Sequence, residues 1–257
     1  MGKESIYKIA RLIAASKKLV AFSGAGISTE SGIPDFRGPG GIWTRYDPDD
    51  FTYQKFIQDA EARKKHWNLL LGSEFIKPDV SPNPAHYALA ELERMGKLDC
   101  LITQNVDGLH EMAGSSKDKV IHLHGTMERA KCLSCGNLYP IEELRAWLSQ
   151  GVEDPRCPKC GGLLKPDAVL FGESMPVWET REAQRRSQNC DLFVVVGSSL
   201  VVYPAALMPR YALESGAKLI VVNQLPTDLD EKADILIHGK AGEVLPQVVE
   251  VLKQAGV

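Results

Sequence analysis

The chain has 257 residues, of which 44% are hydrophobic and 25% are charged. This composition excludes disorder, collagen and coiled coil as descriptions of the whole chain, and the length allows one large domain or a large and a small one. The 30 Lys and Arg residues against 33 Asp and Glu residues give a net charge of −3. No global positive field therefore attracts nucleic acid or anionic lipid, and we expect no direct nucleic-acid partner, although a local basic patch stays open.

The N-terminal segment lacks the apolar core of a signal peptide, and isoleucines such as Ile6 and Ile9 recur in it at the spacing of an amphipathic helix. The longest uncharged stretch, 192–209, raises the question of a membrane span. Gly197 and Pro204 interrupt this stretch, which leaves too few apolar residues to cross a bilayer. We therefore expect a cytoplasmic protein with no membrane partner.

Short apolar runs alternate with helical patterns along most of the chain. The runs, which we predict to be strands, are residues 19–22, 98–103, 120–123, 192–196, 219–222 and 235–237. Their continuous apolar character is typical of strands covered by helices on both faces. Helices are predicted from Pro84 to near Gly96 and over 205–214 and 242–254. This alternation predicts an α/β fold with a doubly wound, mainly parallel, Rossmann-like sheet, which binds ligands at the carboxyl ends of its strands.

Two segments depart from this alternation. Residues 32–79 hold a Gly/Pro-rich stretch and then a helical pattern without strands, and residues 126–165 hold two pairs of cysteines. We expect both segments to form a smaller domain inserted into a larger one made of 1–31, 80–125 and 166–257. The cleft between the two domains is then the default ligand site.

Four cysteines form two Cys-x-x-Cys pairs, Cys132 with Cys135 and Cys157 with Cys160, with 21 residues between the pairs. This spacing predicts a tetrahedral zinc site. Four cysteines leave no open coordination position, so the zinc is expected to be structural. The alternative, two disulfides, would require an oxidising compartment.

The first predicted strand leads directly into Gly24-Ala25-Gly26-Ile27-Ser28. Glycines after a strand let backbone N–H groups approach a phosphate closely. The third glycine of the dinucleotide fingerprint is absent, because Thr29 stands there, and no acidic residue ends a second strand about twenty positions on. The alternative of a simple tight turn between strand and helix therefore stays open.

Polar residues also follow three further predicted strands. They are Gln104 to His110 after 98–103, Gly197 to Ser199 after 192–196, and Asn223 with Gln224 after 219–222. Each set alone could cap a loop. Four polar or glycine-rich strand ends in one doubly wound sheet favour a nucleotide-sized ligand.

His122 and His124 alternate along a predicted strand, so both side chains could face one side. A metal site would need another ligand nearby, and none stands out. His124 lies last in the strand, where it could reach the cleft, and a histidine pKa near 6.5 suits a general base. We interpret His122 as structural, and a purely structural role for His124 stays an alternative.

Eight motifs occur together in chain order: GAGIS (24–28), GIPDFRG (32–38), TQNVDGLH (103–110), HG (124–125), the paired cysteines, FGE (171–173), GSSLVVYPA (197–205) and VNQ (222–224). The sequence resembles a NAD-dependent protein-lysine deacylase of the sirtuin family, of prokaryotic type, over nearly its whole length. The resemblance implies a Rossmann-like NAD domain and a small zinc domain, with NAD and acyl-lysine meeting in the cleft between them.

The resemblance also assigns roles to residues. His124, the general base, and Asn105 would be catalytic, and Val169, Phe171 and Gly172 would bind the peptide backbone as an added strand. One structural zinc would be held by the four cysteines. NAD, the co-substrate, would be bound by Gly24, Ala25, Gly26, Ser28, Asp35, Phe36, Arg37, Gln104, Asn105, Asp107, Gly197, Ser198, Ser199, Asn223, Gln224, Leu225 and Ala241.

The expected reaction gives free lysine, nicotinamide and O-acetyl-ADP-ribose from acetyl-lysine protein substrates. Members of the family that remove acidic acyl groups carry Tyr-x-x-Arg, which this chain lacks, and residues 66–70 offer no cation in its place. Because a buried charge without a partner is costly, we predict removal of acetyl and other neutral acyl groups. The alternatives are mono-ADP-ribosyl transfer and a non-catalytic, NAD-sensing protein that uses its zinc module for binding.

Overall fold

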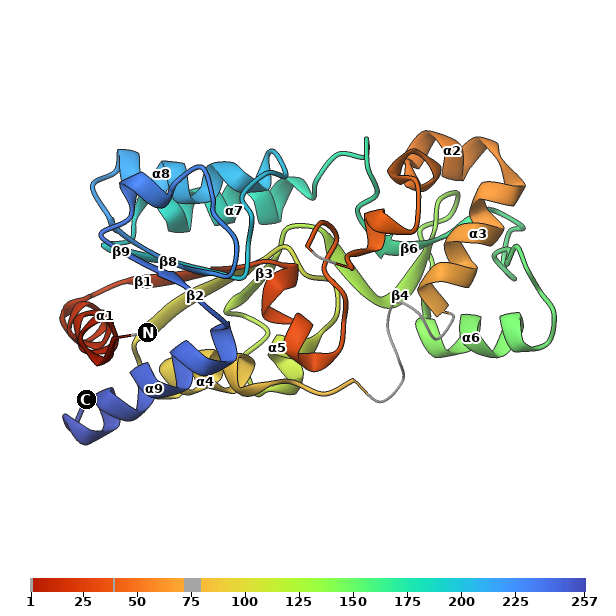
Figure 1. The fold of residues 1–257 in the computed structure, drawn as a ribbon. Coiled ribbons are helices and arrows are strands. Elements are labelled where there is room, and N and C mark those ends of the chain that lie inside the picture. Colours follow the sequence, from red (N-terminus) through yellow and green to blue (C-terminus); the bar gives the residue numbers. More distant parts are fainter. Residues whose placement is uncertain (1, 39, 72–79) are drawn as a thin grey trace.

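The structure of the protein, a computed structural model, describes residues 2–38, 40–71 and 80–257. A six-stranded sheet forms the core of the larger lobe, in the order β3-β2-β1-β7-β8-β9 (Figure 1). Every neighbouring pair in this sheet is parallel. Its strands are β1 (Leu19–Ser23), β2 (Leu98–Thr103), β3 (Val120–His122), β7 (Leu192–Val196), β8 (Lys218–Asn223) and β9 (Ile235–His238). The predicted α/β fold with a doubly wound parallel sheet is confirmed.

The sheet is covered by helices on both faces. One face packs against α1 (Lys3–Ala15), α4 (Pro84–Arg94) and α9 (Ala241–Gln254), and the other against α7 (Val177–Gln188) and α8 (Met208–Glu214) (Figure 1). Residues of the central strands alternate between the two layers: Ala21 belongs to the first, whereas Val20 and Phe22 belong to the second. All residues of β1 and β7 are buried, which explains their continuous apolar sequence.

The smaller lobe has an antiparallel sheet in the order β5-β4-β6. Its strands are β4 (Gly125–Cys132), β5 (Leu138–Pro140) and β6 (Leu164–Ala168), and its helices are α2 (Tyr53–Gln58), α3 (Ala60–Leu71) and α6 (Ile141–Ser149). Phe56, Trp67 and Leu144 join these elements in one core. As the sequence predicts, the described part of 32–79 contributes helices and no strand; residues 39 and 72–79 of that segment lie outside the described residues.

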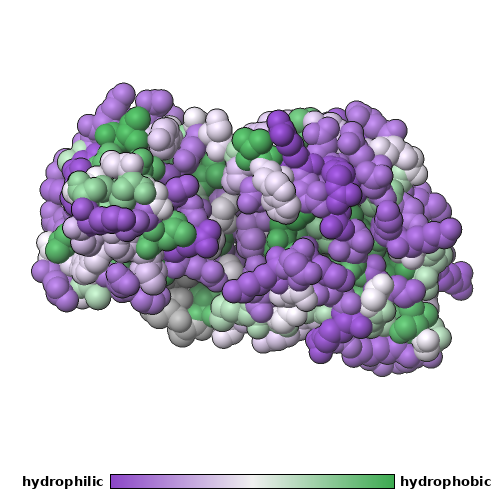
Figure 2. Space-filling view, turned by 180° about the vertical axis from the view of Figure 1, so that it is seen from behind, coloured by the Kyte–Doolittle hydropathy of each residue, from purple (hydrophilic) through white to green (hydrophobic). Residues whose placement is uncertain are grey.

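Shorter helices complete the fold. They are α5 (Leu109–Met112) and the 3₁₀ turns η1 (Ala25–Ile27), η2 (Thr29–Ser31), η3 (Ile42–Thr44), η4 (Pro48–Phe51), η5 (Ala205–Leu207) and η6 (Asp230–Lys232). Within the described residues, no helix is both long and apolar enough to cross a membrane. Seen from behind, polar residues cover most of the surface and a notch separates the two lobes (Figure 2).

The six predicted strands are found within one or two residues of their expected ends, and so are the predicted helices at α4 and α9. The amphipathic N-terminal helix is found as α1, and the helix predicted over 205–214 is found as the 3₁₀ turn η5 followed by α8, which begins at Met208. Helix α7 and the three strands of the small sheet were not predicted. The expected division into domains stays a proposal. Strand β6 pairs with β4 in the small sheet, so a boundary after residue 165 would cut through this strand.

Candidate functional site

A cavity of about 470 Å³ opens at the carboxyl ends of the large sheet's strands and extends to the small lobe. The strand order reverses between β1 and β7. The loops that follow these two strands therefore diverge and leave room for a ligand. Every residue that the sequence predicts to bind NAD or substrate lines this cavity, together with His124. The fold thus brings together candidates that lie as far apart in the chain as Gly24 and Ala241.

The loops after β1 and β7 touch each other through their glycines. The Gly26 N–H group donates to the Gly197 carbonyl oxygen at 2.8 Å. A Cβ atom at Gly24 would lie 2.9 Å from that same oxygen, and one at Gly197 would lie 2.2 Å from the Ile27 nitrogen. Gly197 also has a φ of 60°, in the region that favours glycine. The glycines therefore allow the contact between the two loops, and the Gly26 N–H group is already used within the protein.

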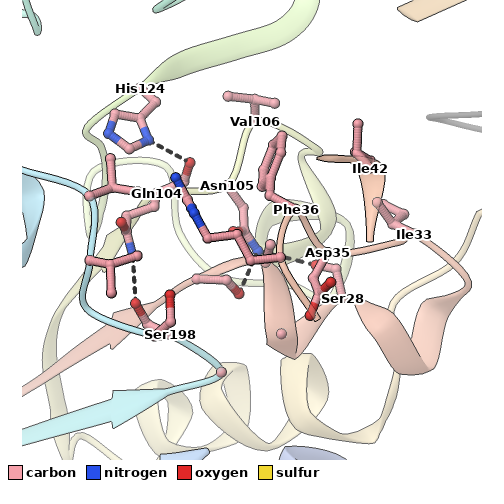
Figure 3. A pocket seen from close by; sticks show the side chains of 18 of the residues that line it. Ser28, Ile33, Asp35, Phe36, Ile42, Gln104, Asn105, Val106, His124 and Ser198 are labelled. Carbon is pink, nitrogen blue, oxygen red and sulfur yellow. Dashed lines mark hydrogen bonds between the residues drawn. The ribbon is translucent and has the colours of Figure 1, made fainter. Parts of the chain in front are cut away.

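A second set of contacts joins the first loop to the loop after β2. Ser28, which is buried, donates from its hydroxyl to the Asp107 carboxylate at 2.7 Å, and the Asn105 side-chain amide donates to the Ser28 hydroxyl oxygen at 3.1 Å and to the Gly24 carbonyl oxygen at 3.2 Å. Asp107 also accepts from the Leu109 N–H group at 3.0 Å. Burial raises the pKa of Asp107. This network fixes three predicted NAD-binding side chains relative to each other (Figure 3).

Behind this network lies a buried polar layer that the sequence did not predict as part of the site. The Ser23 hydroxyl donates to Thr103 Oγ1 at 2.8 Å and lies 2.8 Å from His110 Nε2. The His86 ring lies beside that of His110, with centroids 5.0 Å apart and the two ring planes tilted by 57°, and burial lowers the pKa of His86 to about 4. His86 lies three residues after Asn83, the N-cap of α4, and takes part in the capping contacts of this helix. Helix capping is therefore enough to explain a histidine at this position, and the sequence contained no separate sign that it lies near the site.

His124 is held in a defined tautomer. Its Nδ1 atom lies 3.1 Å from the Gln104 carbonyl oxygen (Figure 3). A carbonyl oxygen only accepts, so Nδ1 carries the hydrogen and, in the neutral ring, Nε2 keeps a lone pair. Burial lowers the pKa of His124, so the ring is neutral at pH 7. It can therefore accept a proton at Nε2.

His122 faces a different environment. Its Nε2 atom lies 2.6 Å from a carboxylate oxygen of Glu111. Burial acts to lower the pKa of His122, but the hydrogen bond and charge of Glu111 outweigh burial and raise it. Because this pairing favours the protonated ring, His122 is poorly suited to act as a base at neutral pH, in keeping with the structural interpretation.

Two further contacts shape the other end of the cavity. The Gln104 amide donates to Ser198 Oγ at 2.9 Å (Figure 3), and the Asn223 amide donates to the Leu225 carbonyl oxygen at 2.7 Å. These side chains follow β2, β7 and β8, three strands that face the cavity with their carboxyl ends. Polar groups thus line the strand ends on both sides of the point where the strand order reverses, and the residues present fit NAD.

The predicted peptide-binding segment, 169–172, lies between the two lobes. The Val169 N–H group donates to the His124 carbonyl oxygen at 2.8 Å, and the Tyr53 N–H group donates to the Phe171 carbonyl oxygen at 2.9 Å. The buried Lys165 ammonium donates to the carbonyl oxygens of Pro166 and Ala168 at 2.8 and 2.5 Å. This segment is therefore tied to the backbone of the predicted base.

The four predicted zinc ligands come together in the small lobe. Their Sγ atoms all lie within 4.8 Å of one another, and none of the four is in a disulfide. A tetrahedral site with Zn–S bonds of about 2.3 Å places its sulfur atoms roughly 3.8 Å apart. The Cys132–Cys160 and Cys135–Cys157 separations are 3.5 and 3.7 Å. This cluster fits a structural zinc.

A nucleotide-sized cavity at the switch point of a parallel sheet, with a four-cysteine centre on a second lobe, defines a nucleotide-binding α/β protein that carries a metal module. The chain matches the model of the Sir2 family over residues 24–204. It therefore belongs to the Sir2 family, the sirtuins, as the motifs predict.

Relatives align over nearly the whole chain. It is 47% identical over 252 residues to NAD-dependent protein deacetylase 1 of Pyrobaculum aerophilum, covering 97% of this chain and 96% of that protein. It is 48% identical over 254 residues to NAD-dependent protein deacylase 2 of Archaeoglobus fulgidus, covering 98% of each.

Solved structures agree with these matches. A Sir2 enzyme aligns with a TM-score of 0.89 and 47% identity, over 99% of this chain and 100% of that one. A Sir2 protein bound to a myristoylated histone peptide aligns with a TM-score of 0.82 and 42% identity, over 99% of each chain.

Proposed function

We propose that this protein removes acetyl and other neutral acyl groups from protein lysines in a reaction that consumes NAD and one molecule of water and gives nicotinamide, O-acyl-ADP-ribose and free lysine. The observation that carries the proposal is the geometry of His124. Its Nδ1–H group is held by the Gln104 carbonyl, and its ring lines the same cavity as the loops after β1, β2, β7 and β8. The names of the relatives, NAD-dependent deacetylases and deacylases, support it.

NAD bound in this cavity would supply a ribose carbon that bonds to the acyl oxygen as nicotinamide leaves, and a water molecule would later take the place of the lysine nitrogen on the acyl carbon. His124 would accept a proton at Nε2 from a ribose hydroxyl, since this is the ring atom that its contact with Gln104 leaves basic. Val169 and Phe171 would hold the substrate backbone, and the contact of the Val169 N–H group with the His124 carbonyl keeps peptide and base in register.

Asn105 and Asp107 would orient the nicotinamide ribose, because their shared contact with Ser28 fixes both side chains before a ligand enters. Asp35, Phe36 and Arg37 come from the loop that leads into the small lobe and line the same cavity. In this arrangement Phe36, packed on Trp43 with ring centroids 5.4 Å apart, would keep water from the ribose carbon until the acyl oxygen has bonded to it. We keep the cytoplasm as the proposed location.

The decisive experiment incubates the protein with NAD and an acetyl-lysine peptide and follows both nicotinamide and peptide mass. We expect nicotinamide release to equal the loss of acetyl groups, and no release with the unmodified peptide. Gain of ADP-ribose by a peptide that keeps its acetyl group would establish the transferase alternative. Binding of NAD without nicotinamide release would establish the sensor.

The choice of neutral acyl groups rests on the cavity wall. On the small-lobe side this wall includes Ile42, Leu70, Met127 and Ala168, which form one apolar cluster. An anionic acyl group buried against such a wall would lose its hydration without gaining a partner. Comparing succinyl-lysine with acetyl-lysine on one peptide tests this, and faster cleavage of succinyl-lysine would contradict it.

A further inference from the structure

The hydroxyl group of Tyr139 reaches one sulfur atom of the four-cysteine cluster. Tyr139 lies on β5, opposite Ala130 of β4, and strand β4 ends at Cys132, a member of the cluster. The Tyr139 hydroxyl oxygen lies 3.1 Å from Cys157 Sγ. Because the two residues are 18 positions apart in the chain, this contact depends on the fold of the small lobe and not on a local turn.

The direction of this hydrogen bond follows from the chemistry of the cluster. A cysteine binds zinc as a thiolate, which has no hydrogen to donate. In the zinc-bound protein the Tyr139 hydroxyl is therefore the donor and the Cys157 sulfur atom is the acceptor. A hydrogen bond to an ionised acceptor is stronger than one between two neutral groups.

The cluster has a use for such a donor. Four thiolates outweigh the two positive charges of a zinc ion, so the bound site carries an excess of negative charge. Cys157 is only 2% exposed, so water does little to compensate its charge. Cys132, the other buried member, accepts from the backbone N–H group of Cys135 at 3.5 Å. Cys157 instead has a side-chain donor at a shorter distance.

Packing holds the Tyr139 ring in place for this contact. Its centroid lies 6.0 Å from that of Trp147, on α6, with the two ring planes inclined at 59°. Both rings pack against the core of the small lobe, which includes Leu144 and Cys157 itself. The phenol is thus fixed by apolar contacts while its hydroxyl points to the cluster.

We infer that Tyr139 is a positioning residue of the metal centre, whose hydroxyl group holds the Cys157 thiolate in place and slows the release of zinc. Groups that hydrogen-bond to metal ligands orient them, and the loss of one typically lowers metal affinity by about 10–100-fold. Tyr139 does not line the cavity at the strand ends. This role is therefore separate from the proposed deacylase reaction.

The test uses the zinc-loaded chain and Tyr139→Phe, which removes the hydroxyl and keeps the ring on Trp147. Each protein is mixed with an excess of a colorimetric zinc chelator, and the transfer of zinc is followed by absorbance. We expect Tyr139→Phe to release zinc about tenfold faster than the unmodified protein, at the lower end of the usual range for such contacts.

The absorption spectrum of the cobalt-loaded protein separates this hydrogen bond from a general loss of stability. Co²⁺ in a thiolate site gives charge-transfer bands in which an electron moves from sulfur to the metal. A donor on the sulfur atom stabilises the lone pair that loses the electron, so Tyr139→Phe should shift these bands to longer wavelength. Trp147→Phe is the matched control, since it alters the packing beneath the tyrosine and keeps the hydroxyl, and it should leave the bands in place.

Equal release rates and equal band positions in Tyr139→Phe and the unmodified protein, with one metal ion per chain in each, would overturn the inference. Faster release of zinc without a shift of the bands would also overturn it, because the hydroxyl would then act only through the stability of the lobe. Both measurements follow the metal alone, so their outcome leaves the proposed deacylase function to its own assay.

Discussion

The two lobes of this protein are built on different physical principles. The large lobe is held by apolar strands buried on both faces, as in β1 and β7. The small lobe has a compact apolar core around Phe56, Trp67 and Leu144, beside four cysteines whose sulfur atoms converge. We expect the first lobe to be stabilised mainly by its buried apolar strands and the second to gain further stability from a zinc ion bound by its four cysteines. Reagents that remove metal should therefore act on one lobe and leave the other folded.

The largest effect is expected from Cys157→Ser. Because the free energy of zinc binding is largely folding free energy for such a module, the small lobe should lose its structure and the protein its deacylase activity. Metal analysis should find the zinc gone, and circular dichroism should show partial loss of structure. The matched control is Cys190→Ala, which lies buried in the large lobe and should retain one zinc per chain. A full complement of zinc in Cys157→Ser would show that the ligand set is wrong.

The next largest effect is expected at the carboxyl ends of the strands of the large sheet. His124→Ala should lower kcat by about 10²–10⁴-fold, the usual contribution of a positioned acid–base group. Zinc content and melting temperature should stay close to those of the unmodified protein, because the ring makes one hydrogen bond to backbone and is only partly buried. His122→Asn is the comparison: its ring pairs with Glu111 and should matter less for kcat. Equal losses of kcat in both variants would show that His124 has no special role as the general base.

The same contrast between the lobes explains what could be predicted from sequence. The strands of the large sheet were predictable because burial on both faces leaves a continuous apolar run, as in Leu192–Val196. Strand β4 was not, because its alternation is broken by two adjacent exposed residues, Glu128 and Arg129, and its partner β6 lies far along the chain. For the site, the sequence motifs identified the residues at the carboxyl ends of the strands of the large sheet. Residues 66–70 were considered only for the cation that they lack in the acyl pocket, and His86 was not assigned to the site, since a lone histidine on a helix carries no signal until its neighbours are known.

Acidification should destabilise the protein through its buried histidines. The pKa of His86 is lowered to about 4 and that of His66 to about 3, both by burial, whereas the unfolded chain titrates near 6.5. Below pH 6.5 the unfolded state therefore binds more protons, and the free energy of unfolding falls as the pH falls towards 4. Each histidine contributes a slope of at most about 1.4 kcal/mol per pH unit. Chemical denaturation at several pH values measures this slope.

His66→Phe sharpens that experiment, since it should remove the contribution of His66 to the slope while leaving the fold intact. Above pH 7 neither ring is protonated in either state, so this part of the pH dependence should vanish there. A slope between pH 6.5 and 4 that is the same with and without His66 would mean that its ring is accessible to protons in the folded state.

The smallest effect concerns the junction between the lobes. The Lys165 ammonium, which is buried, contacts the carbonyl oxygens of Pro166 and Ala168 and lies 3.0 Å from the Glu173 carboxylate. It thus fixes the turn that carries the predicted peptide-binding residues. Lys165→Met should raise KM for the acyl peptide by several-fold to about tenfold, because a segment that must be ordered on binding weakens affinity, while KM for NAD stays unchanged.

Rescue distinguishes this positioning role from a general loss of stability. Lys165→Arg keeps the cation and can donate to the same oxygens, so it should recover part of the peptide affinity, whereas a merely space-filling role would be met equally well by methionine. A parallel rise in KM for both substrates would indicate that Lys165 supports the whole junction between the lobes. The strand ends that are predicted to bind NAD, those of β1, β2, β7 and β8, lie outside the turn that this ammonium contacts.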